Sequence, residues 1–531
     1  MTLTATSPLK QAEPTQEAQE ETPSAVRRPN RRAVMVSAVL TQLMIVLDLT
    51  IIAIALPRMQ DDLGMTVSQS PWTVTGYSLA FGGLVLFGGR LCAVVGIRRS
   101  YQVGLIGFGI ASLAAGMATS FSVLLAARVA QGCFGALLAP TSQSLLNVTF
   151  TERAERERVF AIFGATGGLG AAVGLLVGGA LTDWFSWRWA LYINILLAAA
   201  SLLIGQRSLP PADQRDRGSR ITDDLSGLVL GCGACFSAVY GLDRAQQTSW
   251  TSTSTVSWLA LGGIAAALFV VRERFANRPV LPLSLMALPV RAASYATQFV
   301  VGAAQMGAII YLTYYMQNHF GYSPLKSGVV FLPMVLALIA TAIPAGRIIV
   351  PRLGARGTLP LGLAVLAGSF LIFSRMTTES TYEHVALPGL IVFGMGLGLT
   401  MPVTFNSGTR GVDAKRTGLA SAILSAAQQI GGSFGVALMT SYATQHAEDY
   451  VTDHTEEVKA AAMEVMMRAQ ALPQSSAGKQ IIESLKAQLI DRAQNEAYSG
   501  GFSMMAWILA GAVAVLVVCG IGLSVRRRRT R

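Results

Sequence analysis

The feature that most constrains this chain is a charge placed inside an apolar run. Residues 33–56 read AVMVSAVLTQLMIVLDLTIIAIAL and contain one charged residue, Asp48. About 20 consecutive apolar residues suffice for a helix to cross a bilayer, and this run is longer. A carboxylate in the hydrocarbon costs roughly 2.5–3.5 kcal/mol on insertion scales, so an acid there marks a functional site by default. The sequence therefore predicts a transmembrane helix whose acid faces the protein interior.

The composition places the chain among polytopic membrane proteins. Its 531 residues are 52% hydrophobic and 13% charged, whereas soluble proteins are about 25% charged. The net charge of +12 does not indicate a nucleic-acid partner, because the basic residues lie in short clusters between apolar runs. Membrane proteins encode their orientation in this way. Cys232 and Cys235 form a C-x-x-C pair without a second pair or a nearby histidine, so we predict no metal site and no disulfide framework.

Fourteen apolar segments are predicted as membrane spans. They cover residues 33–57, 71–89, 101–119, 121–147, 158–182, 188–205, 225–243, 256–271, 294–318, 325–350, 358–374, 386–405, 417–441 and 503–525. With a cytoplasmic N-terminus, the outer segments would hold 10 Lys and Arg residues and the fourth span one, which leaves 30 of the 41 for the cytoplasmic side. Because basic residues accumulate on the cytoplasmic side, this predicts a multi-pass protein of the bacterial inner (plasma) membrane with both termini cytoplasmic.

The segments outside the spans differ in composition. Residues 1–26 are rich in Glu, Gln, Thr, Pro and Ser, so we expect a disordered cytoplasmic tail over residues 1–32. The basic residues 526–531 form a second cytoplasmic tail. The loop 442–502 mixes acidic and apolar residues at helical spacing, which predicts one or two amphipathic helices that cap the outer mouth of the molecule. A solvated linker is the alternative for this loop.

Polar residues on the first and fourth spans define the predicted chemistry. One face of the first span carries Thr41, Asp48 and Ile52, and one face of the fourth carries Arg128 and Gln131. Arg128 is the only basic residue deep in a predicted span and Asp48 is the only deep acid, so each would be costly without the other. We predict a proton site in which Asp48 gains and loses the proton and Arg128 biases its affinity. The alternative is a purely structural ion pair.

The fifth span is dense in glycine and reads FAIFGATGGLGAAVGLLVGGAL over residues 160–181. A surface with so few side chains lets another helix approach closely and then slide or bend. Ordinary small-residue packing is the alternative. The two interpretations overlap, because a transporter needs a close contact that can still rearrange.

Several motifs occur in one order along residues 33–441. They are LDLTIIAIALP, SPWTVTGYSLAFGGLVLFGGRL, LLAARVAQGCFGA, VGLLVGG with SWRWALYIN, FGYSPLKSGVVFLP and TGLASAILSAAQQIGGSFG. Together they resemble the fourteen-span drug:proton antiporter branch of the major facilitator superfamily. The resemblance implies an all-α fold with six-helix bundles at 33–205 and 294–525 and two extra transmembrane helices within the linker 206–293. It also implies a midplane cavity and rocking alternating access.

The resemblance also implies roles for particular residues. Asp48 matches the acid of the first-span motif, and Arg128, Gln131 and Gly132 match a fourth-span motif linked to proton coupling. The positions that match motifs for gating and close helix packing are Gly89, Arg90, Gly96, Arg98, Gly174, Gly178 and Gly179. We therefore expect these glycines and arginines to control how the helices move against one another.

The chain departs from the family pattern in three places. Ala93 stands where the family usually has an Asp that helps to lock the cytoplasmic side, and the matching loop at 345–357 also lacks an Asp. Leu175 stands where the fifth-span motif usually has Pro. We therefore expect the cytoplasmic side to be locked less firmly. Without the proline, the helix distortion implied by the fifth-span motif is not expected from the sequence.

Other polar and aromatic residues within the spans are candidates to line a substrate cavity. They are Gln42, Tyr77, Asn194, Gln298, Gln305, Tyr311, Tyr314, Asn406, Gln428 and Gln429. The alternative for each is an interhelical hydrogen bond, which is common in membrane bundles. Because no acid lies deep in the second half, neutral, monocationic or zwitterionic amphipathic substrates fit better than dications.

The sequence argues against ATP hydrolysis as the energy source and against a hydrolase activity. It has no Walker A motif and no cytoplasmic segment large enough for an ATPase domain, so an ion gradient must supply the energy. Residues 431–435 fit G-x-S-x-G but lie within a span, without the strand–turn–helix context of a hydrolase. We predict a monomeric exporter without a cofactor, not an enzyme, in which protons drive efflux of an amphipathic drug, antibiotic or secondary metabolite. A lipid or lipid-conjugate translocator and a non-transporting sensor are the alternatives.

Overall fold

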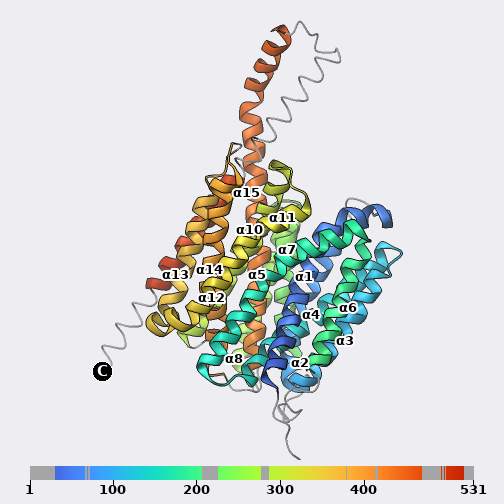
Figure 1. Ribbon diagram of the computed structural model, residues 1–531, viewed down its shortest axis with the longest axis vertical. Helices are drawn as coiled ribbons and strands as arrows, with labels where there is room; N and C mark the ends of the chain where they lie inside the picture. Colours follow the sequence, from blue (N-terminus) through green and yellow to red (C-terminus); the bar gives the residue numbers. More distant parts are fainter. Residues whose placement is uncertain are drawn as a thin grey trace, which may run out of the picture.

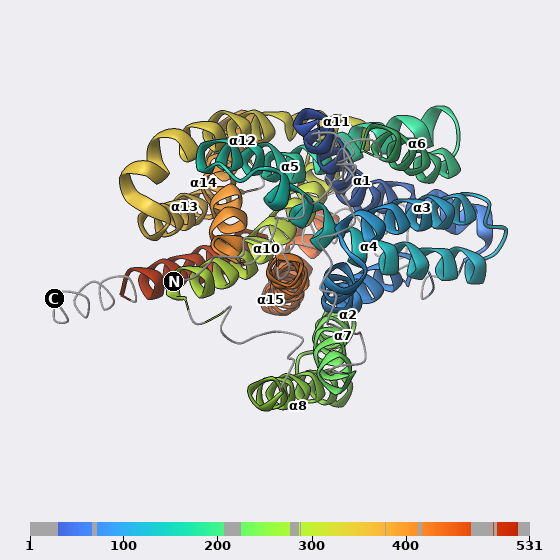
Figure 2. The same cartoon turned by 90° about the horizontal axis from the view of Figure 1, so that it is seen from below.

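Helices make up almost all of the computed structural model, and no strand occurs in the residues it describes. These are residues 30–65, 69, 72–205, 225–276, 286, 288–377, 379–412, 417–468, 492, 496 and 498–518. Most helix axes run along the long direction of the molecule (Figure 1). Seen from below, α1, α3, α4 and α6 lie on one side, α12–α14 lie on the other, and α5, α10 and α15 lie between them (Figure 2).

The helices of the N-terminal half pack on one another. They are α1 (Arg31–Leu63), α2 (Trp72–Val95), α3 (Ile97–Gly116), α4 (Phe121–Thr149), α5 (Arg153–Trp184) and α6 (Trp187–Gly205). The most extensive contacts join α2 to α4, α1 to α5, α3 to α4 and α1 to α6. The turn between α2 and α3 is a single residue, Gly96, with φ 95°. Only glycine adopts such a backbone without strain, so this turn is short because a glycine stands there.

The C-terminal half contains longer and more broken helices. They are α10 (Pro289–Tyr314), η3 (Tyr315–His319), α11 (Pro324–Val330), α12 (Leu332–Pro344), η4 (Ala345–Ile349), α13 (Val350–Phe373), η5 (Tyr382–Ala386), α14 (Leu387–Thr409), α15 (Thr417–Arg468) and a last helix over Tyr498–Val518. The three η segments are π-helical turns. Gly354, with φ 65°, interrupts the helical path, and it separates the predicted spans 325–350 and 358–374.

Two further helices lie between the halves in sequence. These are α7 (Leu225–Gln247) and α8 (Thr253–Phe275), which pack on each other. Only α7 makes extensive contact with the rest of the described molecule, through α2 and α15. The pair lies at the edge of the molecule in Figure 2. Much of the surface of α8 is apolar and exposed, as expected for a helix that faces lipid.

The all-helical membrane class is confirmed. Eleven stretches among the described residues are long and apolar enough to cross a membrane. One of them, Leu325–Phe373, contains two predicted spans, and α3 and α5 coincide with the further predicted spans 101–119 and 158–182. The described residues of the predicted spans are helical apart from residues 117–119, Phe331 and Ser374. The predicted tails at 1–29 and 526–531 lie outside the described residues.

The prediction for the loop 442–502 needs correction up to Arg468. We expected separate helices outside the membrane, but α15 runs without a break for 52 residues. At 1.5 Å per residue it is about 78 Å long, more than twice the roughly 30 Å thickness of a bilayer core. Its upper part continues the helix axis beyond the other helices (Figure 1). The helix continues because no glycine or proline occurs between Gly435 and Pro473.

Glycines bring the backbones of crossing helices into direct contact. Between α10 and α15, a Cβ atom on Gly431 would collide with the Phe299 carbonyl, and one on Gly435 would collide with the Ala303 carbonyl. Between α2 and α4, a Cβ atom on Gly132 would meet the carbonyl of Tyr77. Small residues at such crossings are how membrane helices gain packing energy without a hydrophobic effect to drive them together.

We expect Gly431→Ala to destabilise the protein by about 1–3 kcal/mol, because the added methyl group overpacks a backbone contact. The matched control is Gly263→Ala on α8, where an added Cβ would have no atom within 4 Å. Alanine favours a helix over glycine by roughly 1 kcal/mol, so the control should unfold at the same or a higher temperature. Thermal unfolding in detergent measures both. If Gly431→Ala and Gly263→Ala unfolded at the same temperature, the packing role of the contact between Gly431 and the Phe299 carbonyl would be contradicted.

Candidate functional site

The candidate site is built on the inward face of α1. Thr41, Ile45, Asp48 and Ile52 are all buried, as the helical spacing predicts. This face is covered because α1 packs against α4, α5 and α6. The single acid of the first span is therefore shielded from lipid, and its charge must be balanced by protein groups.

Arg128 on α4 provides that balance. Its Nη1 atom donates to Oδ2 of Asp48 at 2.5 Å, and both side chains have 0% exposure. Oδ1 of Asp48 accepts from Nδ2 of Asn194 on α6 at 2.6 Å and from Nε2 of Gln131 at 3.3 Å. Gln131 Oε1 also accepts from Arg128 Nη1 at 2.8 Å. The carboxylate is thus held by one cation and two amides.

Other helices fix the position of the guanidinium. Arg128 Nε donates to the backbone carbonyl of Thr73 on α2 at 3.0 Å. The guanidinium also lies over the ring of Tyr77, 4.6 Å from its centroid, which is a favourable position for a cation. Gln131 in turn donates to Ser112 Oγ on α3 at 2.7 Å. Five helices, α1, α2, α3, α4 and α6, therefore meet at one ion pair.

Three buried polar atoms of this cluster make no hydrogen bond to any residue that the structure describes. They are Nη2 of Arg128, Oδ1 of Asn194 and the hydroxyl of Tyr77. Buried polar groups are normally paired, and each exception calls for an explanation. Arg128 Nη2 and the Tyr77 hydroxyl are donors, and Asn194 Oδ1 is an acceptor, that the Asp48 carboxylate does not use.

A neutral hydroxyl cluster lies about two to three turns before Asp48 along α1. Thr41 Oγ1 and Ser37 Oγ lie 2.6 Å and 2.9 Å from the Tyr101 hydroxyl, and Ser201 Oγ lies 3.0 Å from it. These side chains join α1 to α3 and α6, and all are buried. These uncharged hydrogen bonds hold α1 against α3 and α6.

The glycines of α5 serve two surfaces. A Cβ on Gly174 would collide with Thr50 of α1, and one on Gly178 would lie 2.9 Å from Ile51. Gly179 points instead to the backbone of Leu325 at the start of α11, at 3.6 Å. The predicted packing motif thus lies against α1 at two positions and against the C-terminal half at the third. The side chain of Leu175 lies outside the described residues.

The predicted gating residues of the α2–α3 region lie at one end of the bundle. Gly89 and Arg90 are buried near the end of α2, and Arg98 is partly exposed in the first turn of α3. Gly96 forms the turn between them with φ 95°. The glycine is required by the backbone itself, whereas the arginines place positive charge at this end of the molecule.

The predicted cavity residues do not form one cluster. Tyr77 and Asn194 belong to the Asp48 site, and Gln298 accepts from Thr404 at 2.6 Å. Tyr311 packs edge-on against Tyr498 in the C-terminal half. Of the remaining candidates, the buried ones are Gln305 and Asn406 and the partly buried ones are Gln42, Gln428 and Gln429, while the side chain of Tyr314 lies outside the described residues.

Contacts between the two halves were not foreseen from the sequence. Gln143 on α4 donates to Ser425 on α15 at 3.2 Å, and Thr409 on α14 donates to Asn147 at 3.2 Å. Phe163 of α5 packs edge-on against Phe405, also on α14, with ring centroids 5.9 Å apart. These side chains bring α4 and α5 of the N-terminal half into contact with α14 and α15 of the C-terminal half, at the end of the molecule where α4 and α5 are joined. Their pairing depends on the arrangement of helices far apart in sequence.

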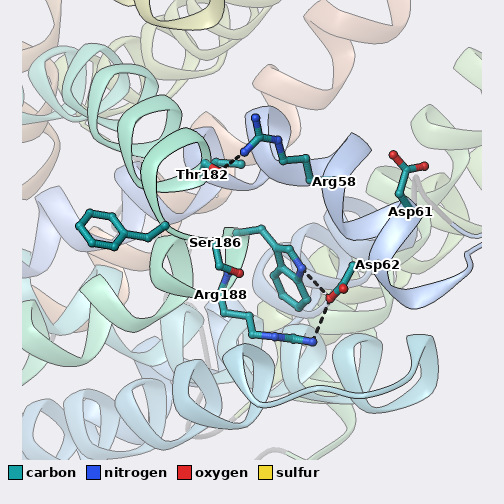
Figure 3. Close-up of a pocket in the computed structure, with 8 residues that line it drawn as sticks. Arg58, Asp61, Asp62, Thr182, Ser186 and Arg188 are labelled. Atoms are coloured by element: carbon teal, nitrogen blue, oxygen red, sulfur yellow. Dashed lines mark hydrogen bonds and ion pairs between the residues drawn. The ribbon is translucent and has the colours of Figure 1, made fainter.

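A shallow cleft of about 550 Å³ lies at the opposite end of the N-terminal half (Figure 3). Asp62 at the end of α1 accepts from Arg188 at 2.9 Å and from the Trp187 indole at 3.0 Å. Arg58 pairs with Asp183 at 2.7 Å and donates to the Thr182 carbonyl. These partly exposed bonds tie the end of α1 to the turn between α5 and α6, and they do not reach Asp48.

Comparison with known proteins now bears on the identity of the chain. Residues 38–436 match the family model described as Major Facilitator Superfamily. The chain belongs to the Major Facilitator Superfamily. The crystal structure of the human organic anion transporter MFSD10 shares the fold of this chain: it aligns with a TM-score of 0.55 at 14% identity and covers 91% of this chain and 100% of that one.

Bacterial relatives of this major facilitator share more of its sequence. Puromycin resistance protein pur8 of Streptomyces alboniger is 39% identical over 432 residues, which are 80% of this chain and 84% of that protein. Cephamycin export protein CmcT of Amycolatopsis lactamdurans is 33% identical and covers 76% of this chain and 83% of its own. The tetracenomycin C resistance and export protein of Streptomyces glaucescens is 29% identical over 95% of this chain and 94% of that protein.

The family and the helices together identify a multi-pass transporter of the bacterial plasma membrane. Family members are transporters and not enzymes, and the relatives named above are antibiotic resistance or export proteins. The G-x-S-x-G match at 431–435 has a structural reason in this major facilitator. Gly431 and Gly435 pack against carbonyls of α10 in the middle of a helix, not on a nucleophile-bearing turn.

We expect Arg128→Met to destabilise the protein by about 3–5 kcal/mol, because it leaves the Asp48 charge buried without its cation. The double variant Asp48→Asn with Arg128→Met removes both charges and should recover at least half of that loss. Denaturant unfolding in detergent of the wild type, both single variants and the double variant measures the coupling. Additive losses would show that the two charges do not depend on each other.

Proposed function

We propose that this protein exports amphipathic drugs, antibiotics or secondary metabolites by exchanging them for protons, and that Asp48 carries the proton. The observation that supports this most is the buried pair of Asp48 and Arg128 at 2.5 Å, with 0% exposure of both side chains. A carboxylate inside a membrane bundle is costly to maintain and usually marks an ion or proton pathway. The antibiotic-export names of the relatives support the choice of substrate class.

Protonation of Asp48 would change the bonding of the whole cluster. The charged carboxylate accepts from Arg128, Gln131 and Asn194. A neutral carboxyl group is a weaker partner for the guanidinium and can itself donate a hydrogen bond. Arg128 would then rely more on the Thr73 carbonyl and the Tyr77 ring. These partners lie on different helices. A change in the charge of Asp48 would therefore change the interactions that hold α1, α2, α4 and α6 together.

This change would be coupled to alternating access of two six-helix bundles. We place the bundles at 33–205 and 294–525, with the linker 206–293 between them, fourteen spans and both termini in the cytoplasm. In our scheme, substrate binds from the cytoplasm or inner leaflet while Asp48 is charged, and the proton enters from outside before substrate leaves. A potential of 100 mV supplies about 2.3 kcal/mol per charge, and one pH unit adds about 1.4 kcal/mol.

The distribution of buried acids bears on the substrate. Among the fully buried residues that the structure describes, the only carboxylates are Asp48 and Glu273, and neither lies in the C-terminal half. Two positive charges on one substrate would need more compensation than this, because isolated buried charges are strongly disfavoured. We therefore propose substrates that are neutral, zwitterionic or singly positive.

We expect puromycin, lincomycin or tetracenomycin C to release protons from purified wild-type protein in weakly buffered detergent solution. In Asp48→Asn the release should fall at least about ten-fold, because an amide does not titrate in this range. Binding of the compound, followed by tryptophan fluorescence, should persist. A pH-indicator dye measures the release.

The matched control is Asp61→Asn, which removes an exposed carboxylate from the outer end of the same helix. It should release protons as the wild type does. Compound binding without proton release in the wild type would overturn the antiport proposal. Equal release from the wild type and Asp48→Asn would assign the proton to another group.

A further inference from the structure

The two inserted helices have no role in the scheme above, yet one of them packs closely on α2, a helix that contributes to the ion-pair cluster. Helix α7 packs along α2 over several turns. The Trp72 and Tyr240 rings lie 6.3 Å apart. A Cβ on Gly82 would lie 3.0 Å from Val239. Two helices that approach through glycine in this way are held at a fixed distance and register.

A polar contact joins α7 to the first turn of α2. Thr75 Oγ1 donates to Oδ1 of Asp243 at 3.0 Å, and Thr75 is buried. The charged neighbour of Asp243 on its own helix is Arg244, whose Nε donates to the Tyr240 hydroxyl at 3.1 Å. A hydrogen bond to a charged group is stronger than one between neutral groups. The contact can therefore fix the end of α2 more firmly than apolar packing alone.

The same turn of α2 holds the cation of the proton site. Thr73, two residues before Thr75, accepts from Arg128 Nε at 3.0 Å through its backbone carbonyl. Tyr77, two residues after Thr75, places its ring under the guanidinium. A shift of this turn would move both partners of Arg128 together. Helix α2 is thus held between α7 on one side and α4 on the other.

We infer that Asp243 is a positioning residue for the proton site: its hydrogen bond from Thr75 holds the first turn of α2 so that Thr73 and Tyr77 fix Arg128 against Asp48. This inference rests on the proposed antiport function. It gives the inserted pair of helices a task, which is to support α2 from outside the two bundles. Among the described residues, the ionisable groups around Asp48 itself are Arg128 and Tyr77, and α6 contributes the neutral amide of Asn194.

The experiment compares variants that remove the hydrogen bond with variants that keep it. Thr75→Val and Asp243→Ala remove it, whereas Thr75→Ser and Asp243→Asn keep a donor and an acceptor. Proton release evoked by puromycin, lincomycin or tetracenomycin C is recorded from pH 5 to pH 9 for each purified full-length protein. Removing the bond should move the midpoint of release upward by about 0.5 pH unit or more, because a less well placed cation stabilises the carboxylate less.

The conservative variants should keep the wild-type midpoint. A control on the inserted pair is Ser257→Ala on α8, which removes a hydroxyl that bonds only its own helix, at the Thr253 carbonyl. It should also leave the midpoint unchanged. An unchanged midpoint in Thr75→Val and Asp243→Ala would overturn the inference. A shift in Asp243→Asn as large as that in Asp243→Ala would overturn it too, because charge and not position would then be responsible.

A second measurement keeps the test independent of transport. If no compound evokes proton release from the wild type, the antiport proposal fails and this inference is decided by stability alone. Thr75→Val, Arg128→Met and the double variant are then compared by thermal unfolding. Residues that act through one contact show non-additive losses. A double variant that loses less than the sum supports the positioning role, and strictly additive losses refute it.

Discussion

The packing of the N-terminal half depends on the buried ion pair of Asp48 and Arg128. Both side chains have 0% exposure, so neither charge is stabilised by bulk water, and each must be matched by protein groups at short range. That requirement fixes how deep α4 lies beside α1. It also explains why neutral groups such as Gln131 and Asn194 are directed at a single carboxylate. A core of this kind is stable only when its members are present together, because each leaves a buried polar partner unpaired when it is removed.

The glycines of α5 make contacts both within the N-terminal half and between the two halves. On α5, Gly174 and Gly178 face α1 within the same half, whereas Gly179 faces Leu325 of the other half at 3.6 Å. Contacts inside a half are tight enough that an added methyl group would collide. The contact between halves at Gly179 is of ordinary van der Waals length. The glycine contacts of α5 are therefore tighter within the N-terminal half than between the two halves.

The inserted helices and the cleft near Asp62 act at the outside of this arrangement. Helix α7 lies along α2, and the bonds of Asp62 tie the end of α1 to the start of α6. Both contacts restrain helices that contribute to the ion-pair cluster. Helix α7 also packs on α15 of the C-terminal half, so it contacts both halves, whereas the bonds of Asp62 stay within the N-terminal half.

The sequence by itself determined the all-helical membrane class and the two charged residues that the structure pairs. Long apolar runs can only be helices in a bilayer, since every backbone group must be bonded internally, and helical spacing alone put Thr41 and Asp48 on one buried face. It did not determine that α15 continues to Arg468, because acidic and apolar residues at helical spacing fit both a new helix and a longer one. Nor did it reveal the Thr75–Asp243 bond. That contact joins residues 168 positions apart, and only the packing of α7 on α2 brings them within hydrogen-bonding distance.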